Sequence, residues 1–121
     1  LSPRMAGDYA RLLKDFIRSV RTDLKTPDLP FAVGEVNSHS WAFGDIVRQG
    51  QADVCRDDGN AVLIKTTDLS REGRGGPLHF DADGTIELGI RFAEGLKPLL
   101  MPKKNNPPIL PATAGPSAQA K

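Results

Sequence analysis

Residues 31–36 read FAVGEV, and residues 61–67 read AVLIKTT. Both are short apolar runs that lack the alternation of polar and apolar side chains found in strands with one exposed face. Runs of this kind are typical of parallel strands that helices cover on both faces. The two runs therefore predict a pair of buried strands at the centre of the fold.

A helix is expected before the first strand, over residues 7–25, where apolar residues recur at helical spacing and charged residues fill the opposite face. Asp8 is the expected N-cap. Pro27 and Pro30 end the helix, because proline cannot continue it. The inward side chains predicted here are Tyr9, Leu12, Leu13, Phe16, Ile17, Val20 and Leu24.

Two further helices follow the strands. One is expected over about 44–57 and ends through Gly59; the other is expected over about 83–97, with Asp81 or Asp83 as its cap. The predicted inward side chains are Ile46, Val47, Val54 and Cys55 in the first of these helices, and Ile86, Ile90, Phe92, Ala93 and Leu96 in the second.

Strands that alternate with helices predict an α/β fold with parallel pairing through right-handed crossovers. A parallel sheet is normally several strands wide, so two strands leave one strand edge and part of the helix faces without a partner. We therefore expect a truncated three-layer α/β/α domain. Residues 1–100 would form its C-terminal portion, and the Pro- and Ala-rich residues 101–121 a disordered tail.

Composition gives little support to several classes of function. The 121 residues carry a net charge of +1, which favours neither a nucleic-acid nor a membrane partner. No apolar run approaches the ~20 residues of a membrane span. Cys55 is the single cysteine, so no internal disulfide and no Cys/His metal spacing are expected, and the cellular compartment stays open.

One histidine, His79, stands between the second strand and the last helix. In open parallel sheets, functional groups gather in loops beyond the carboxyl ends of the strands. A general base of a Ser/His/Asp hydrolase would lie at this position. By position alone, a histidine that packs structurally at the junction of loop and helix fits equally well.

The stretch GPLHFDADGTIELGIRFAEGL, residues 76–96, resembles the end of the esterase domain in SGNH-type carbohydrate esterases, the sialate O-acetylesterase and acetylxylan esterase group. YARLLKDFIRSVRTDL, LPFAVGEV and VRQGQADV resemble the family's preceding helix, strand and helix. The resemblance covers residues 8–97. It implies a flavodoxin-like fold and the deacetylation of acetylated carbohydrates through a serine acyl-enzyme, with no metal or organic cofactor.

Carried over by position, the resemblance implies that His79 is the catalytic base. The family's aspartate, three residues earlier, falls at Gly76, which has no carboxylate; Asp68 or Glu72 would have to replace it. The family's nucleophile has a strand–Gly-x-Ser–helix setting, which Ser2, Ser19, Ser38, Ser40 and Ser70 lack. We therefore expect no esterase activity from these 121 residues alone.

Other polar residues follow the first strand. Glu35 is expected to hydrogen-bond nearby backbone or loop. Asn37, His39 and Trp41 would line either a sugar-binding rim or an ordinary surface loop. The rival to an esterase is a non-catalytic, degenerate esterase fragment that binds a partner, or a second copy of itself, through its uncovered strand edge.

Overall fold

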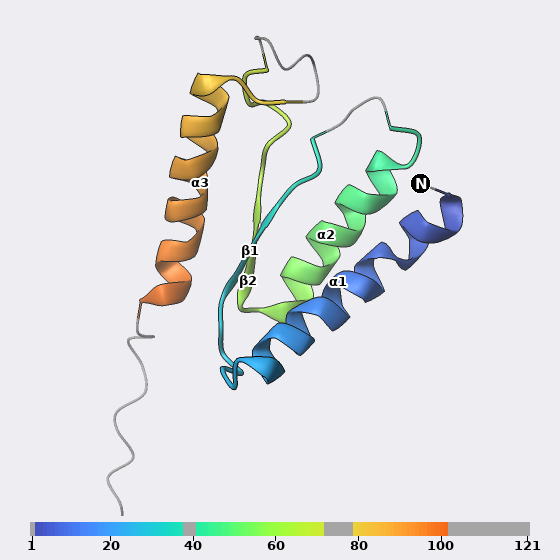
Figure 1. Cartoon of the computed structure of the whole chain (residues 1–121), viewed down its shortest axis with the longest axis vertical. Helices are drawn as coiled ribbons and strands as arrows, with labels where there is room; N and C mark the ends of the chain where they lie inside the picture. Colours follow the sequence, from blue (N-terminus) through green and yellow to red (C-terminus); the bar gives the residue numbers. More distant parts are fainter. Residues whose placement is uncertain (1, 38–40, 72–78, 102–121) are drawn as a thin grey trace, which may run out of the picture.

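The computed structural model describes residues 2–37, 41–71 and 79–101. Helices and strands alternate in the order that the sequence predicts (Figure 1). The elements are α1 (Pro3–Asp23), β1 (Phe31–Gly34), α2 (Gly44–Asp58), β2 (Ala61–Ile64) and α3 (Ala82–Leu100). None of these helices is both long and apolar enough to cross a membrane. Apart from Met101, the predicted tail lies outside the described residues.

The two strands pair in parallel at the centre of three layers. Phe31 lies opposite Ala61, and the register continues to Gly34 opposite Ile64. α2 connects the strands and lies on one face of the sheet with α1 beside it, while α3 lies on the other face (Figure 1). The predicted α/β class, with parallel strands between layers of helices, is confirmed.

The start of the first helix differs from the prediction. α1 begins at Pro3 because Ser2 caps it, and Ser2 Oγ accepts a hydrogen bond from the backbone N of Met5 at 3.3 Å. Proline suits a first turn, since its missing N–H has no helical partner there. Asp8, the predicted cap, instead lies inside the helix and pairs with Arg11 at 3.5 Å.

The later helix ends lie closer to the predictions. Gly59 follows α2 with a φ of 69°, the left-handed conformation that favours glycine. Asp81, rather than Asp83, caps α3, and its Oδ1 accepts a hydrogen bond from the backbone N of Gly84 at 2.7 Å. α3 continues past the predicted end to Leu100.

Both strands end earlier than predicted, at Gly34 and Ile64. The ladder extends by one more bond, from the backbone N of Glu35 to the carbonyl O of Ile64 at 2.9 Å. Beyond that point a side chain takes over, because Thr66 Oγ1 donates to the carbonyl O of Glu35 at 2.7 Å. The two chains therefore stay together past the regular sheet.

The core joins the helices to both faces of the sheet. Its buried apolar side chains are Ala6, Ile17, Val33, Val47, Val54, Cys55, Ile64 and Leu69. Cys55 is the small buried residue that the sequence predicts, and burial raises the pKa of its thiol. Glycine brings α3 close to the strands, since a Cβ on Gly95 would lie 2.6 Å from Ile64 Cδ1.

Part of each predicted inward stripe is exposed, so these predictions were wrong. Ile46 on α2 is 47% exposed, and Ile86 and Ile90 on α3 are 63% and 47% exposed. Leu12 and Phe16 on α1 are 52% and 58% exposed. The described sheet has two strands and is too narrow to cover the full width of the helices beside it. Leu24, which lies at the C-cap of α1, and Ala93 on α3 are exposed as well.

An ion pair joins the end of α1 to the end of α2. The Nη1 and Nη2 atoms of Arg21 donate to the two carboxylate oxygens of Asp58 at 2.7 and 2.8 Å, and its Nε donates to the carbonyl O of Leu29 at 3.0 Å. The guanidinium also lies 5.5 Å from the ring centroid of Phe31. The pair thereby fixes the turn that leads into β1 against the turn that leads into β2.

Replacing Arg21 is expected to destabilise the fold. Arg21→Met leaves the Asp58 carboxylate, which is only 15% exposed, without its charge-assisted hydrogen bonds, at a cost of about 2 kcal/mol of unfolding free energy. Arg11→Met is the control, because the Arg11 side chain is 63% exposed and its loss should cost at most about 0.5 kcal/mol. Urea unfolding measures both; equal losses in the two variants would contradict the role given to Arg21.

The same pair predicts a pH dependence. Hydrogen bonds from Arg21 lower the pKa of the Asp58 carboxyl in the folded chain. Its contribution is therefore present above the carboxyl's ordinary pKa of about 3.9, and it is lost as the pH falls further, through the lowered value. Unfolding free energies measured between neutral pH and acid should show a decline below about pH 4 that Asp58→Asn reduces.

Candidate functional site

The carboxyl ends of β1 and β2 lie side by side and form one edge of the sheet, from which two loops leave (Figure 1). The bond from Thr66 Oγ1 to the carbonyl O of Glu35 ties these loops together where they begin. Thr66 is 2% exposed, so this contact is inside the protein. The edge is therefore a rigid base for side chains in both loops.

Glu35 is a buried carboxylate at this edge. Its side chain is 5% exposed, and Oε1 pairs with Lys65 Nζ at 2.8 Å. The second oxygen, Oε2, is buried and makes no hydrogen bond within the described part of the chain. The side chain of Glu35 thus bonds to Lys65, in the loop after β2, in agreement with the predicted contact with nearby backbone or loop.

Side chains of α2 close the outer edge of β1. The amide of Gln51 accepts from the backbone N of Val36 at 2.9 Å and donates to the carbonyl O of Gly34 at 3.0 Å. Arg48 Nη1 donates to the carbonyl O of Val36 at 3.2 Å. These bonds match those that a further strand would make, so β1 is closed at its carboxyl end.

Gln51 is a buried polar residue for which no role was predicted from the sequence. It is 2% exposed, and its Nε2 also donates to the hydroxyl of Tyr9 at 3.3 Å. A signal was present, because Gln51 stands four residues after Val47 and four before Cys55, on the apolar stripe of the helix. A polar residue at such a position indicates a buried hydrogen-bonding role.

His79 lies just before α3 and is exposed. Ser70 and Asp81, which flank this part of the loop, are bonded to each other: Ser70 Oγ donates to Asp81 Oδ2, and the backbone N of Asp81 donates to the carbonyl O of Ser70 at 3.2 Å. This contact holds the start of α3 against the chain that leaves β2. His79, two residues from Asp81, is thereby kept near the carboxyl edge of the sheet.

Asp68 and Glu72 are the carboxylates that would have to replace the family's aspartate, and the structure describes Asp68. Asp68 binds Arg91 of α3 through both oxygens, at 2.7 and 2.9 Å, and hydrogen bonds from Arg91 lower the pKa of this carboxyl to about 2. Arg91 Nη1 also donates to the carbonyl O of Lys65 at 3.0 Å. Asp68 thus serves to attach α3 to the loop. Gly76 and Glu72 lie outside the described residues.

An aromatic cavity opens beside the end of β1. It has a volume of about 520 Å³, and Tyr9, Trp41, Phe43 and Val47 are among the residues that line it. The ring of Trp41 is accessible, since this residue is 54% exposed. Trp41 therefore lies where the predicted sugar-binding rim would need it, whereas His39 lies outside the described residues.

The ionisable residues of the described ranges do not form a metal centre, since they contain no group of three or more His, Cys, Asp or Glu side chains suited to hold an ion. The groups that the described residues bring toward the carboxyl edge include the buried carboxylate of Glu35 and the aromatic cavity. His79 is the residue to which the family resemblance assigns the role of base.

Comparison with known proteins gives one match. The model of the family described as "Carbohydrate esterase, sialic acid-specific acetylesterase" matches residues 1–97. No curated protein and no solved structure matches the chain. The matched range contains α1, both strands, α2, His79 and most of α3. The chain therefore belongs to the carbohydrate esterase family of sialic acid-specific acetylesterases.

Proposed function

We propose that this chain carries the histidine-bearing part of an esterase domain that removes acetyl groups from acetylated carbohydrates. Membership of the family supports the substrate class. The observation that carries the proposal is the Ser70–Asp81 contact, which holds the start of α3, and with it the segment that contains His79, to the chain that leaves β2. In parallel α/β sheets, catalytic groups gather at the carboxyl edge of the sheet.

In the proposed reaction, His79 acts as general base and then as general acid. It takes the proton of a serine hydroxyl while the serine oxygen attacks the acetyl carbonyl, and it passes that proton to the sugar oxygen as the ester bond breaks. Water then attacks the acetyl-enzyme, again with the imidazole as base, and releases acetate. No step requires a metal or an organic cofactor.

The attacking serine is proposed to come from strands beyond β1, so that residues 1–100 form the C-terminal portion of a wider sheet. Ser70 is unsuited to the role, because its hydroxyl donates to Asp81. On the outer edge of β1, Gln51 and Arg48 bond to the backbone N and O of Val36 and to the carbonyl O of Gly34. The part of β1 that precedes the carbonyl of Gly34 is where another strand would pair.

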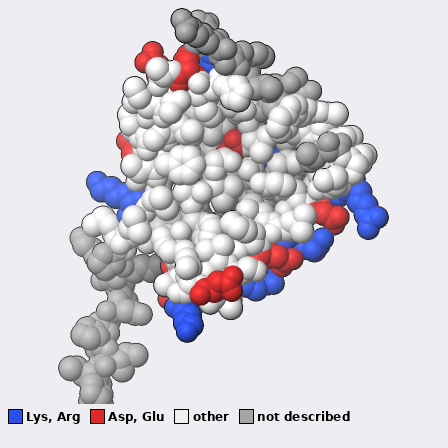
Figure 2. Space-filling model, viewed as in Figure 1, with Lys and Arg blue, Asp and Glu red and all other residues white. Residues whose placement is uncertain are grey.

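A second candidate function is a non-catalytic interaction module. Apolar side chains on both sides of the sheet favour it: Leu12 and Phe16 on α1 and Ile86 on α3 are each more than half exposed, at 52%, 58% and 63%. In the view of Figure 2, Lys, Arg, Asp and Glu are sparse over the middle of the molecule and gather at its margins. An apolar surface beside a short open edge favours association with another protein or a second copy.

The esterase proposal predicts that the 121-residue chain alone hydrolyses 4-nitrophenyl acetate no faster than the same concentration of free imidazole does, because the imidazole of His79 lacks the serine that would complete the enzyme. Release of 4-nitrophenol measures this rate. His79→Ala is the control, and it should match the parent chain. Clear turnover that His79→Ala abolishes would show that the chain is already a complete enzyme.

Joining the chain to the N-terminal portion of a family member that holds the Gly-x-Ser motif should create turnover. In that fusion His79→Ala should lower kcat by about 10³-fold or more, and Gly76→Asp should raise it, by up to ~10⁴-fold, if the carboxylate restores the imidazole's tautomer. A fusion that hydrolyses the ester equally well without His79 would refute its role as base.

The interaction-module candidate predicts concentration-dependent self-association, measured by sedimentation velocity. The double variant Leu12→Lys, Ile86→Lys should sediment as a monomer, because it places a charge at one exposed apolar residue of α1 and at one of α3. A matched double variant, Leu24→Lys, Leu100→Lys, alters leucines that are 61% and 66% exposed near the helix ends and should still associate. A monomeric parent chain would argue against this candidate.

A further inference from the structure

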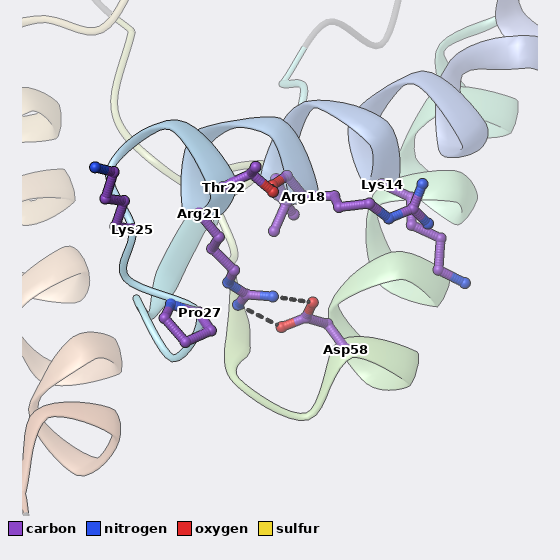
Figure 3. A pocket seen from close by; sticks show the side chains of 8 residues that line it. Lys14, Arg18, Arg21, Thr22, Lys25, Pro27 and Asp58 are labelled. Carbon is purple, nitrogen blue, oxygen red and sulfur yellow. Dashed lines mark hydrogen bonds and ion pairs between the residues drawn. The ribbon is translucent and has the colours of Figure 1, made fainter.

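Basic side chains surround a second cavity, at the end of the sheet opposite His79. It lies near the residues that lead into β1 and β2, and its volume is about 440 Å³. Four cations line it, Lys14, Arg18, Arg21 and Lys25, with one carboxylate, Asp58. Figure 3 shows that α1 and the segment after it supply the cations, while Asp58 approaches from the end of α2.

Most of this positive charge is available to a ligand. Arg21 is neutralised by its two bonds to Asp58. Arg18 shares only an exposed pair with Asp15, at 3.0 Å, and such pairs are weak. Lys14 is near enough to Asp58 to help lower the pKa of that carboxyl, but neither Lys14 nor Lys25 forms a close ion pair among the described residues. Lys14 and Arg18, one helical turn apart on α1, can therefore turn their charge toward an anion, and Lys25 adds positive charge at the other end of the cavity.

The negative end of α1 does not cancel this charge. A helix C-terminus carries the equivalent of about half a negative charge. Asp28 adds a carboxylate near enough to act on Arg21. Four cations against Asp58, Asp28, the Asp15 carboxylate that pairs with Arg18, and the half charge of the helix end leave a small positive excess at the cavity. The net field at this site therefore attracts anions.

The cavity also offers apolar surface. Pro27 and the aliphatic stems of the basic side chains provide it, while Ile17, which is only 2% exposed, lies beneath them. Its volume is within the range of small-molecule sites. We propose that this cavity binds a small organic anion, whose phosphate or carboxylate contacts Lys14 and Arg18 while its body lies against the apolar part of the wall and Lys25 adds to the positive field.

Such a ligand would contact α1, the turn before β1 and the end of α2 at once. These are the elements that the Arg21–Asp58 pair joins. A ligand that binds the folded state and not the unfolded state would raise the free energy of unfolding in proportion to the logarithm of its concentration. The site is separate from the carboxyl edge of the sheet, so its occupation does not depend on esterase activity.

Three sugars that share one ring body and differ in charge test the proposal on the full chain: glucose 6-phosphate, glucuronate and glucose. Isothermal titration should show that at least one of the two anions binds about tenfold or more tightly than glucose. Added NaCl should weaken that binding, because the cations are exposed to solvent. The anion that binds identifies the source as a phosphorylated or a carboxylated compound.

A pair of charge-matched variants locates the site. Lys14→Gln, Lys25→Gln should lower the affinity by about tenfold or more, whereas Arg4→Gln, Lys97→Gln, which removes the same charge from exposed residues outside the cavity, should stay within about twofold of the parent. Thermal unfolding confirms that both variants fold. The proposal is overturned if neither anion binds better than glucose, or if the two double variants bind alike.

Discussion

The parallel pairing of β1 with β2 determines where every other element lies. Four residue pairs, from Phe31–Ala61 to Gly34–Ile64, hold the strands in register. Parallel strands need a long connection, and α2 provides it and covers one face of the sheet. Because both strands run the same way, their carboxyl ends and the loops that follow meet at one edge. The position of His79 near that edge follows from this constraint.

Polar side chains form hydrogen bonds with backbone groups that so short a sheet leaves unpaired. Gln51 and Arg48 bond to the outer edge of β1, and Thr66 joins the two strands beyond the last ladder bond. At the other end, Arg21 and Asp58 join the turns from which the strands start. The sheet is therefore held at both ends by hydrogen bonds from helix and loop side chains, and its apolar core lies between them.

The sequence was sufficient to predict the order of elements and the parallel strands, because apolar periodicity and turn residues determine these locally, and it narrowed the cap of α3 to Asp81 or Asp83, of which Asp81 forms it. It was insufficient for the exposure of Leu12, Phe16 and Ile86, since periodicity shows which helix face is apolar but not how wide the sheet beneath it is. The roles of Gln51 and Asp68 depend on partners far along the chain, Val36 and Arg91. The role of His79 as a base rests on the family resemblance and stays a prediction.

Amide hydrogen exchange along β1 tests the central claim most directly, because the pairing assigns alternate residues to opposite edges. The account predicts slow exchange at Phe31 and Glu35, which donate to Asn60 and Ile64, and at Val36, which donates to Gln51. Ala32 and Gly34, which face the outer edge, should exchange faster. Uniform exchange along the segment, or protection of Ala32 and Gly34 in place of their neighbours, would contradict the parallel pairing on which the account rests.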